Sequence, residues 1–283
     1  MLREIAIADA YGAGFEFASR ERVAQLNDLS AYYPHGRHGF VAKYTDDTQM
    51  SLAIAEHVLS GAAWSKLAVA DRLVAAFKRD PRPGYSDRFY RLLCSVGSGE
   101  ELLEQVDANS RRNGAAIRVA PIGYLNDSSS VIAAASLQAK VTHDTEEAVR
   151  ASCAVALVAH LGLHRDGRWR DIPEYLENCG FGGWDYEWRA PVSVSAYESV
   201  SAALGCLLRN DSISALIKES VSLGGDTDSV AAIAAALASC FRGYETRLPE
   251  TLVDALDEPL YGLGFLDAVD HQLRSSRQCP ARC

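Results

Sequence analysis

Long uninterrupted hydrophobic runs are absent from this chain of 283 residues. No stretch approaches the roughly 18 apolar residues that a membrane-spanning helix requires, so we expect no membrane partner. Residues 1–10 carry charges and lack a long apolar centre, which argues against a secretory signal. Together these absences favour a cytoplasmic protein.

Basic residues are also scarce. Lys and Arg total 28 against 37 Asp and Glu, which gives a net charge of −9. This balance argues against nucleic acid as a partner, because binding to a phosphate backbone depends on clustered cations. A small anionic ligand remains compatible with it, since backbone amides and a few arginines can reverse the field locally.

The common signatures of nucleophilic and nucleotide chemistry are missing as well. The chain has no G-x-S-x-G elbow, P-loop, Rossmann glycine fingerprint or C-x-x-C pair. Four cysteines lie in apolar helical runs and are expected to be small buried hydrophobes in a reducing compartment. Cys279 and Cys283 could pair or bind a metal, but we expect incidental thiols of a frayed tail. Covalent catalysis by Ser or Cys is therefore not favoured.

Period-two patterns typical of strands are scarce, and helical periodicity extends along most of the chain. It predicts helices over residues 2–11, 48–59, 67–77, 131–139, 146–161, 196–208, 213–222, 229–240, 250–256 and 265–274. Asp144 and Glu147 have the spacing of a capping box. We expect an all-α, compact multi-helix orthogonal bundle. It would be a monomer with one domain over residues 1–283 and a tail disordered from about residue 276.

Residues 162–195 interrupt the helical pattern with aromatic and turn-forming residues. A segment of this length without secondary structure of its own is uncommon inside a compact domain. It is better explained as a feature of one domain than as a linker between two. We expect a surface excursion or a lid over a functional site.

Two acidic clusters about 180 residues apart each precede an alanine-rich helical run. They are Thr45-Asp46-Asp47-Thr48 and Gly224-Gly225-Asp226-Thr227-Asp228-Ser229. Helix capping alone would explain one such cluster. Two are harder to explain in that way, because carboxylates rarely enter a core unless they are paired or bind a metal. We expect the clusters to meet at the helix starts and share a dinuclear site, with oxygen ligands that favour Mg²⁺ or Mn²⁺ over Zn²⁺.

Three further segments carry candidate functional groups. Glu16 follows a glycine turn, either as a surface residue or as a base that positions water beside metals. The segment 82–86, Arg-Pro-Gly-Tyr-Ser, is a turn before a helix, either a plain loop or a phosphate cradle. Arginines 111, 112 and 118 flank an Asn-Gly turn and would suit an anionic ligand.

Three histidines lie in polar or capping positions. His143 is at a helix start, where a single histidine is more often structural than catalytic. His35 and His38 belong to the polar sequence PHGRHGF. They could be ligands, but we expect a solvated loop instead.

Taken in order, several motifs resemble those of the ADP-ribosylglycohydrolase family, which includes the dinitrogenase-reductase-activating glycohydrolases. They are ADAYGAGFE, YTDDTQM, NGAAIRVAPIG, THDTEEA and GGDTDSVAAIAAALA, and they extend from about Ile5 to Gly243. The resemblance implies an all-α fold with two Mg²⁺ or Mn²⁺ ions. It also implies cleavage of the N- or O-glycosidic bond between ADP-ribose and a protein side chain. Arginine is the favoured linkage, because the resemblance is to bacterial-type hydrolases.

The resemblance implies roles for particular residues. The metal ligands would be Thr45, Asp46, Asp47, Asp226, Asp228 and Ser229. The catalytic carboxylates would be Glu16, as base or water-positioning residue, and Asp47. The groups in contact with ADP-ribose would be Gly84, Tyr85 and Ser86 at the diphosphate, Asn113, Gly114 and Ala115 toward the distal ribose and adenosine, and His143.

Two positions depart from the family pattern. Ala8 precedes Asp9 where the family usually has Gly, and Ser229 stands where Thr is frequent. Ser keeps the oxygen ligand but has a less restricted rotamer. All four carboxylates are present, which favours an active enzyme over a degenerate binding protein.

The implied mechanism is metal-assisted glycoside cleavage through an oxocarbenium-like state, with Glu16 activating water. Two alternatives share the same motifs. One is another dinuclear-metal hydrolase acting on a nucleotide or phosphate. The other is a non-catalytic relative that binds ADP-ribose.

Overall fold

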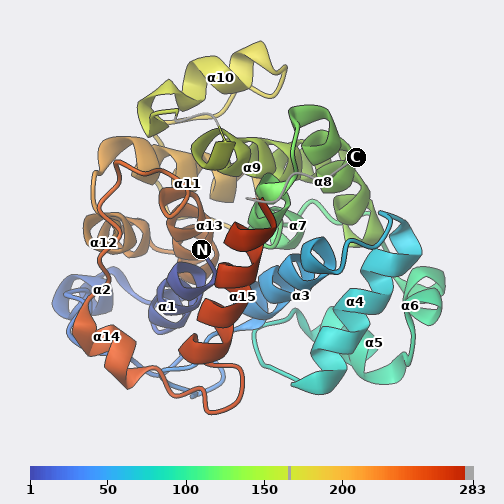
Figure 1. Ribbon diagram of the computed structural model, residues 1–283. Coiled ribbons are helices and arrows are strands. Elements are labelled where there is room, and N and C mark those ends of the chain that lie inside the picture. The colour runs from blue at the N-terminus through green and yellow to red at the C-terminus, as the bar shows by residue number, and fades with distance from the viewer. Residues whose placement is uncertain (165–166, 278–283) are drawn as a thin grey trace.

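The computed structural model describes residues 1–164 and 167–277, whose regular structure is helical, so the all-α prediction is confirmed (Figure 1). The first half contains α1 (Leu2–Ala13), α2 (Arg20–Leu26), α3 (Asp46–Ser60), α4 (Lys66–Arg79), α5 (Asp87–Ser95), α6 (Gly99–Gln105), α7 (Gly114–Ile117), the 3₁₀ helix η1 (Ala120–Tyr124) and α8 (Ser128–Thr142). The second half contains α9 (Glu146–His164), the 3₁₀ helix η2 (Trp169–Asp171), α10 (Ile172–Asn178), α11 (Ala196–Arg209), α12 (Ile213–Leu223), α13 (Thr227–Ala238), α14 (Glu250–Ala255) and α15 (Leu263–Arg277). The predictions for the tail and its two cysteines concern residues 278–283, which lie outside the described ranges.

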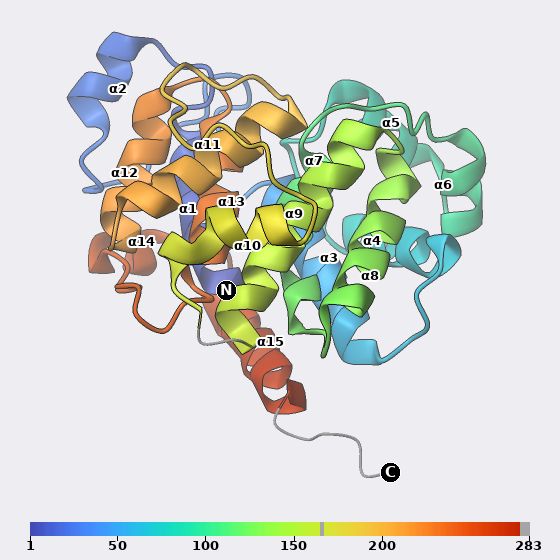
Figure 2. The ribbon, with the colours of Figure 1, turned by 90° about the horizontal axis from the view of Figure 1, so that it is seen from above.

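Helix α13 lies at the centre of the bundle and is buried along its whole length. It contacts α1, α9, α11 and α12, and Figures 1 and 2 show these helices around it. Its many alanines allow neighbouring helices to approach closely, because a methyl group adds little to the distance between helix axes. The central position carries the acidic start of α13 into the interior of the protein.

The first helix extends past residue 11, where we expected it to end before Gly12. Gly12 lies within α1, which continues to Ala13. A Cβ atom at Gly12 would come within 2.5 Å of the Cα atom of Asp228 on α13. This glycine therefore permits close packing of the two helices instead of ending the first one.

Two local sequence predictions need correction. The N-cap of α9 is Thr145, whose hydroxyl accepts from the amide of Ala148 (3.4 Å), and the predicted capping box from Asp144 is absent. Asp144 instead pairs with Lys66 (3.3 Å). The short helices α2, α6 and α10 were not predicted, because fewer than two turns give too little periodicity to identify.

The segment 162–195 is mainly a surface excursion. It completes α9 and then forms η2 and α10, and α10 contacts α9 at the outside of the bundle (Figures 1 and 2). Among its described residues, Val194 alone borders the large cavity discussed below. The described part of this segment is therefore not a lid over that cavity.

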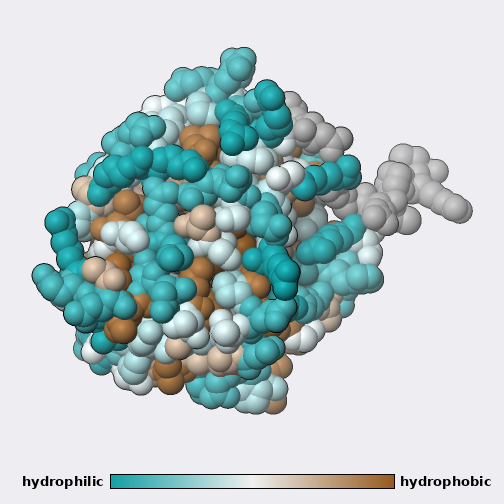
Figure 3. Space-filling view, turned by 90° about the vertical axis from the view of Figure 1, so that its left-hand side faces the viewer, coloured by the Kyte–Doolittle hydropathy of each residue, from teal (hydrophilic) through white to brown (hydrophobic). Residues whose placement is uncertain are grey.

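Polar side chains predominate on the face formed by α2, α12 and α14. In Figure 3 hydrophobic residues appear there as separate patches among hydrophilic ones. This is the pattern of amphipathic helices that turn their apolar sides inward. Among the described residues, none of the helices combines the length and the apolar character needed to cross a bilayer.

Candidate active site

Asp9 on α1 organises the start of α3. Its fully buried carboxylate accepts hydrogen bonds from the backbone amides of Thr45 (2.9 Å) and Thr48 (3.1 Å). It also accepts from both threonine hydroxyls. Burial raises the pKa of Asp9 to about 6, and these donors oppose the rise because they favour the charged form. Four hydrogen bonds thus fix the first acidic cluster to α1.

Within this cluster Thr45 is the N-cap of α3. Its hydroxyl accepts from the amide of Asp47 (3.2 Å) and donates to Asp9 (2.8 Å). Asp46 is half-buried, Asp47 is buried, and both border the cavity. The same turn therefore caps the helix and gathers carboxylates. Helix capping and a metal site, the two interpretations of this cluster, are compatible.

Backbone contacts hold the second cluster at the start of α13. The amide of Asp226 donates to the carbonyl of Val192 (2.9 Å), and the hydroxyl of Thr227 donates to the carbonyl of Gly12 (2.8 Å). Gly225 has a φ angle of +82°, and a Cβ there would come within 2.0 Å of the Val192 oxygen. Only glycine fits this position.

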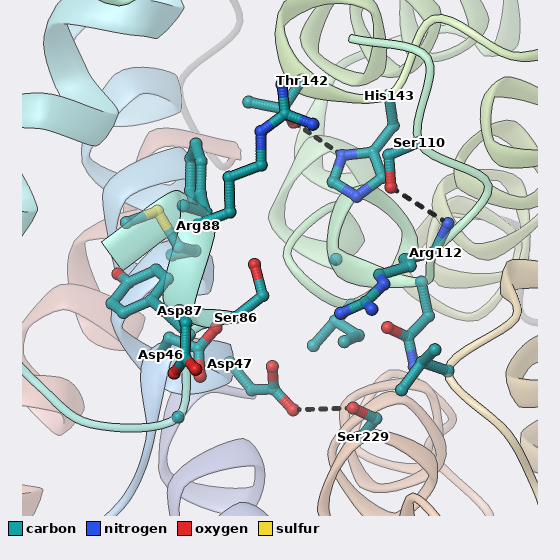
Figure 4. Close-up of a pocket in the computed structure, with 18 of the residues that line it drawn as sticks. Asp46, Asp47, Ser86, Asp87, Arg88, Ser110, Arg112, Thr142, His143 and Ser229 are labelled. Carbon is teal, nitrogen blue, oxygen red and sulfur yellow. Dashed lines mark hydrogen bonds between the residues drawn. The ribbon is translucent and has the colours of Figure 1, made fainter. Parts of the chain in front are cut away.

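The two clusters meet in space. Ser229 donates a hydrogen bond to the carboxylate of Asp47 (3.1 Å), which links positions 182 residues apart (Figure 4). Two sets of three carboxylates have oxygen atoms within 4.8 Å of one another: Asp9, Asp47 and Asp228, and Glu16, Asp226 and Asp228. Five acidic groups from three helices and a loop therefore converge on one small volume, and Asp46 borders the same cavity.

Burial and mutual repulsion both disfavour the charged carboxylates in this volume. Burial raises the pKa of Asp46, Asp47 and Asp228 well above the ordinary value, and neighbouring carboxylates raise it further. Burial also raises the pKa of Asp226, although the side-chain amide of Asn113 donates to it (2.7 Å). Divalent cations would relieve this repulsion, and an oxygen-only donor set fits hard ions such as Mg²⁺ or Mn²⁺.

The turn at residues 84–86 lies directly against the first cluster. Gly84 has a φ angle of +115°, and a Cβ there would come within 2.1 Å of a carboxylate oxygen of Asp46. The hydroxyl of Tyr85 donates to Gln49 (2.6 Å), while Ser86 is exposed at the cavity. Arg82 does not reach the cavity, because it is bound to Glu258 (2.7 Å) and stacked on a core tyrosine.

The segment 113–115 forms part of the opposite wall. Asn113 and Gly114 border the cavity, and the side chain of Asn113 connects Asp226 with Ser199 (2.9 Å). Ala115 is fully buried, and its carbonyl accepts from Gln138 (2.9 Å). Its side chain therefore supports the wall from behind.

His143 borders the cavity in its neutral form. Its pKa falls to about 3, first because of burial and then because Arg118 and Arg112 are close. Nδ1 lies 2.7 Å from the hydroxyl of Thr142, which also accepts from Arg118 (2.9 Å). Arg118 is buried, and its pKa is lowered to about 10 by desolvation.

These residues surround a cavity of about 880 Å³, within the usual range for small-molecule sites of roughly 300–1,000 Å³. Figure 4 shows Asp46 and Asp47 at one end, with Arg88, Arg112 and His143 across from them. Arg37, Arg91 and Arg118 also border the cavity. A protein of net charge −9 thus has one cavity with a carboxylate floor and arginine-rich walls, which suits an anionic ligand bound beside cations.

The histidine loop differs from the prediction. His35 is buried with 4 % of its surface exposed, and its Nε2 lies 2.7 Å from Oε2 of Glu16. His38 is exposed, as expected for a solvated loop. Glu16 itself is half-buried and borders the cavity.

A family model gives the decisive comparison. The model described as "ADP-ribosylglycohydrolase" matches residues 5–279, nearly the whole chain. The chain belongs to the ADP-ribosylglycohydrolase family. This membership confirms the resemblance carried by the acidic motifs and supports ADP-ribosylglycohydrolase activity in general.

Named relatives of the family fall into two groups. The bovine (Bos taurus) protein "ADP-ribosylhydrolase ARH3" is 26% identical, over 74% of this chain and 72% of its own. The Pseudomonas putida (strain GB-1) protein "ADP-ribosylarginine hydrolase Tri1" is 25% identical, over 87% of this chain and 70% of its own. A solved structure titled "ADP-ribosylglycohydrolase-related protein complex" has a TM-score of 0.74 at 21% identity, covering 98% of this chain and 95% of that one. It shows the shared fold.

Two residues that contact this candidate site in the ADP-ribosylglycohydrolase chain carried no role in the sequence prediction. Asp9 supports the first cluster, and a signal was available, because it is a charged residue amid the apolar positions of residues 5–13. His35 contacts Glu16, and its loop sequence gave no signal of burial. Both act by holding other candidate residues.

Proposed function

We propose that this protein is a metal-dependent hydrolase that releases ADP-ribose from a modified protein side chain and so reverses ADP-ribosylation. The main support is the meeting of Asp47 and Ser229, which joins the two acidic clusters at the floor of a cavity large enough for ADP-ribose. Family membership supports the same reaction class.

The proposed metal ligands are the oxygen atoms of Thr45, Asp46, Asp47, Asp226, Asp228 and Ser229, which would hold two Mg²⁺ or Mn²⁺ ions. The donor set fits such ions in charge and in hardness. When bound, the ions would supply Lewis-acid stabilisation of charge at the reacting sugar.

The proposed base is Glu16. Its carboxylate accepts a proton from water as the water oxygen bonds to the anomeric carbon of the proximal ribose. The bond from that carbon to the side-chain nitrogen or oxygen breaks, and the leaving group takes up a proton. Positive charge develops on the sugar ring in the transition state, and the carboxylate of Asp47 would stabilise it.

The remaining groups would bind the ADP-ribose. Gly84, Tyr85 and Ser86 offer a turn at the start of α5 to the diphosphate, and arginines of the wall add positive charge. Asn113 and Gly114, supported by Ala115, would line the distal ribose and adenosine side. Neutral His143 would donate or accept one hydrogen bond.

Arginine is the favoured linkage. The support is the similarity to a bacterial relative named as an ADP-ribosylarginine hydrolase, which covers 87% of this chain. In that case the leaving group is a guanidine, which becomes a positively charged guanidinium when it takes up a proton. That charge suits the acidic floor of the cavity.

The test is release of ADP-ribose from ADP-ribosylarginine and ADP-ribosylserine peptides, with Mn²⁺, Mg²⁺ or a chelator. We expect release from the arginine peptide with added metal. Asp46→Asn and Asp228→Asn should each lower it by about 100-fold or more, since a metal-bound nucleophile or charge is lost. Asp254→Asn, on the exposed side of α14, is the matched control.

Near-normal release in both site variants would refute the metal role. Turnover of free nucleotides without release from peptides would instead indicate a phosphate hydrolase. Binding of ADP-ribose by calorimetry without any turnover would indicate a non-catalytic relative.

A further inference from the structure

His35 is fixed in its loop by several contacts. Its backbone amide donates to the carbonyl of Phe40 (2.8 Å), and its carbonyl accepts from the amide of Gly39 (2.9 Å). The ring packs against those of Phe40 and His38, each at a centroid distance of 4.9 Å. A side chain held in this way can orient another group, because it has little freedom of its own.

The hydrogen bonds of this ring determine its tautomer. Nδ1 accepts from the backbone amide of Arg37 (3.0 Å) and lies 3.4 Å from the amide of His38. A backbone amide can only donate, so Nδ1 carries no proton. The proton is therefore on Nε2, which donates to Oε2 of Glu16 at 2.7 Å. Oε2 must be an unprotonated acceptor, and Oε1 is left for another partner.

Glu16 needs such a restraint. Its carboxylate lies within 4.8 Å of Asp226 and Asp228, which repel it. A glutamate side chain has several rotatable bonds and is expected to turn toward solvent under that repulsion. The backbone is held on one side, since the amide of Phe17 donates to the carbonyl of Gly225 (2.8 Å). The bond from His35 holds the carboxylate end.

We propose that His35 is a positioning residue that keeps the Glu16 carboxylate at the acidic floor, with one oxygen bound and the other directed to the reacting water. This rests on the proposed role of Glu16 as base. His35 does not border the cavity. It acts by fixing the orientation of the base.

The same loop also contacts the chain just after the turn at residues 84–86. The side chain of Arg37 donates to both carboxylate oxygens of Asp87, at 2.8 and 2.7 Å, next to Ser86. Both side chains are more than half exposed, so this pair contributes little to stability. Its effect is geometric, because it connects the loop that holds the base to the turn proposed for the diphosphate.

The test compares His35→Phe, His35→Gln and His38→Phe. Phe keeps the ring packing and removes both nitrogens, while Gln retains an N–H donor for Glu16. His38→Phe is the matched control, since His38 is exposed in the same loop. The measurements are kcat and KM for ADP-ribose release, Mn²⁺ affinity by calorimetry, and melting temperature.

We expect His35→Phe to lower kcat by about 10- to 100-fold, the usual cost of losing a group that orients a functional one, with KM within about twofold of the wild type. Mn²⁺ affinity and melting temperature should match those of His38→Phe. His35→Gln should recover most of kcat.

Three results would overturn the proposal: unchanged kcat in His35→Phe, a loss of Mn²⁺ binding or melting temperature that accompanies the loss of kcat, or His35→Gln as slow as His35→Phe. Failure of the proposed function is distinguishable, because the wild-type protein would then release no ADP-ribose, and the positioning role would fall with it.

Discussion

The two acidic clusters are held in place by different means. The first depends on a buried side chain, since Asp9 accepts four hydrogen bonds from Thr45 and Thr48. The second is held by hydrogen bonds to backbone carbonyls, and these require missing side chains, since Gly12 and Gly225 let backbone atoms approach closely. The first anchor is therefore a buried carboxylate, and the second depends on the absence of a side chain.

This difference indicates how each cluster can fail. Removing Asp9 leaves buried donors without a partner, which is costly because they have lost water as well. Adding a methyl group at a glycine contact forces two helices apart, and its cost depends on how far the structure can relax. The following predictions test the contrast, from the largest expected effect to the smallest.

Asp9→Ala should have the largest effect on stability. Two buried amides and two hydroxyls lose their acceptor, at about 1–3 kcal/mol for each buried group left unsatisfied, so we expect a loss of at least about 4 kcal/mol. Urea denaturation measures it. Asp254→Ala, exposed on α14, should change stability by less than about 0.5 kcal/mol. Equal effects of the two variants would contradict the anchoring role of Asp9.

Stabilisation of the protein by Mn²⁺ should depend on both clusters. At about 100 times its dissociation constant, Mn²⁺ should stabilise the wild-type protein by about 2.7 kcal/mol. If the clusters form one site, Asp46→Asn and Asp228→Asn should each abolish most of this gain. Retention of the full gain in either variant would separate the clusters. Urea denaturation with and without Mn²⁺ distinguishes these outcomes.

The pH dependence of stability should have opposite signs in the metal-free and the Mn²⁺-bound protein. Burial raises the pKa of Asp9 to about 6 and that of Asp228 also above its ordinary value. The metal-free folded state then binds more protons than the unfolded state, so stability should fall as pH rises from about 4 through 6 and beyond. With Mn²⁺ bound, protons compete with the ion, and stability should fall as pH decreases. Denaturation at pH 5 and pH 7.5 tests both signs.

Gly12→Ala should weaken the second cluster through steric overlap with Asp228. We expect a loss of about 1–3 kcal/mol and weaker Mn²⁺ binding. Gly264→Ala is the matched control, because that glycine is exposed in α15 and its added methyl would meet nothing within 4 Å. It should be neutral or stabilising, by up to about 1 kcal/mol. A neutral Gly12→Ala would show that close approach is not required.

Ser229→Thr should have the smallest effect. The hydroxyl that donates to Asp47 is kept, and β-branching restricts its rotamer. We expect stability within about 0.5 kcal/mol of the wild type. Mn²⁺ affinity, measured by calorimetry, should rise by no more than a few-fold. A large loss of affinity would mean that the site is shaped specifically for serine.

The sequence was sufficient for the long helices and the acidic clusters. Periodicity and alanine content predict long helices such as α9 and α13. Two carboxylates in one turn indicate each acidic cluster. The meeting of Asp47 and Ser229 follows from those motifs, because buried carboxylates need partners. Whether each candidate ligand binds metal stays a prediction.

The roles of Gly12 and His35 could not be predicted from the sequence, for a physical reason. Gly12 has the same local appearance whether it ends a helix or permits close packing, and only the position of α13 decides between these roles. His35 lies in a loop whose polarity suggests solvent, yet tertiary contacts bury it beside Glu16. Such contacts depend on segments far apart in the chain.

Close contact between Gly84 and Asp46 has a thermodynamic consequence. Since even a methyl group at Gly84 would overlap the carboxylate, we expect the turn at residues 84–86 and this candidate metal ligand to move together. Any ion that fixes Asp46 would also bias the turn toward one conformation. Linkage requires the reverse effect to be equal, so a ligand on the turn should tighten ion binding by the same factor that the ion tightens ligand binding. Two affinities measured separately would then describe a single coupling free energy.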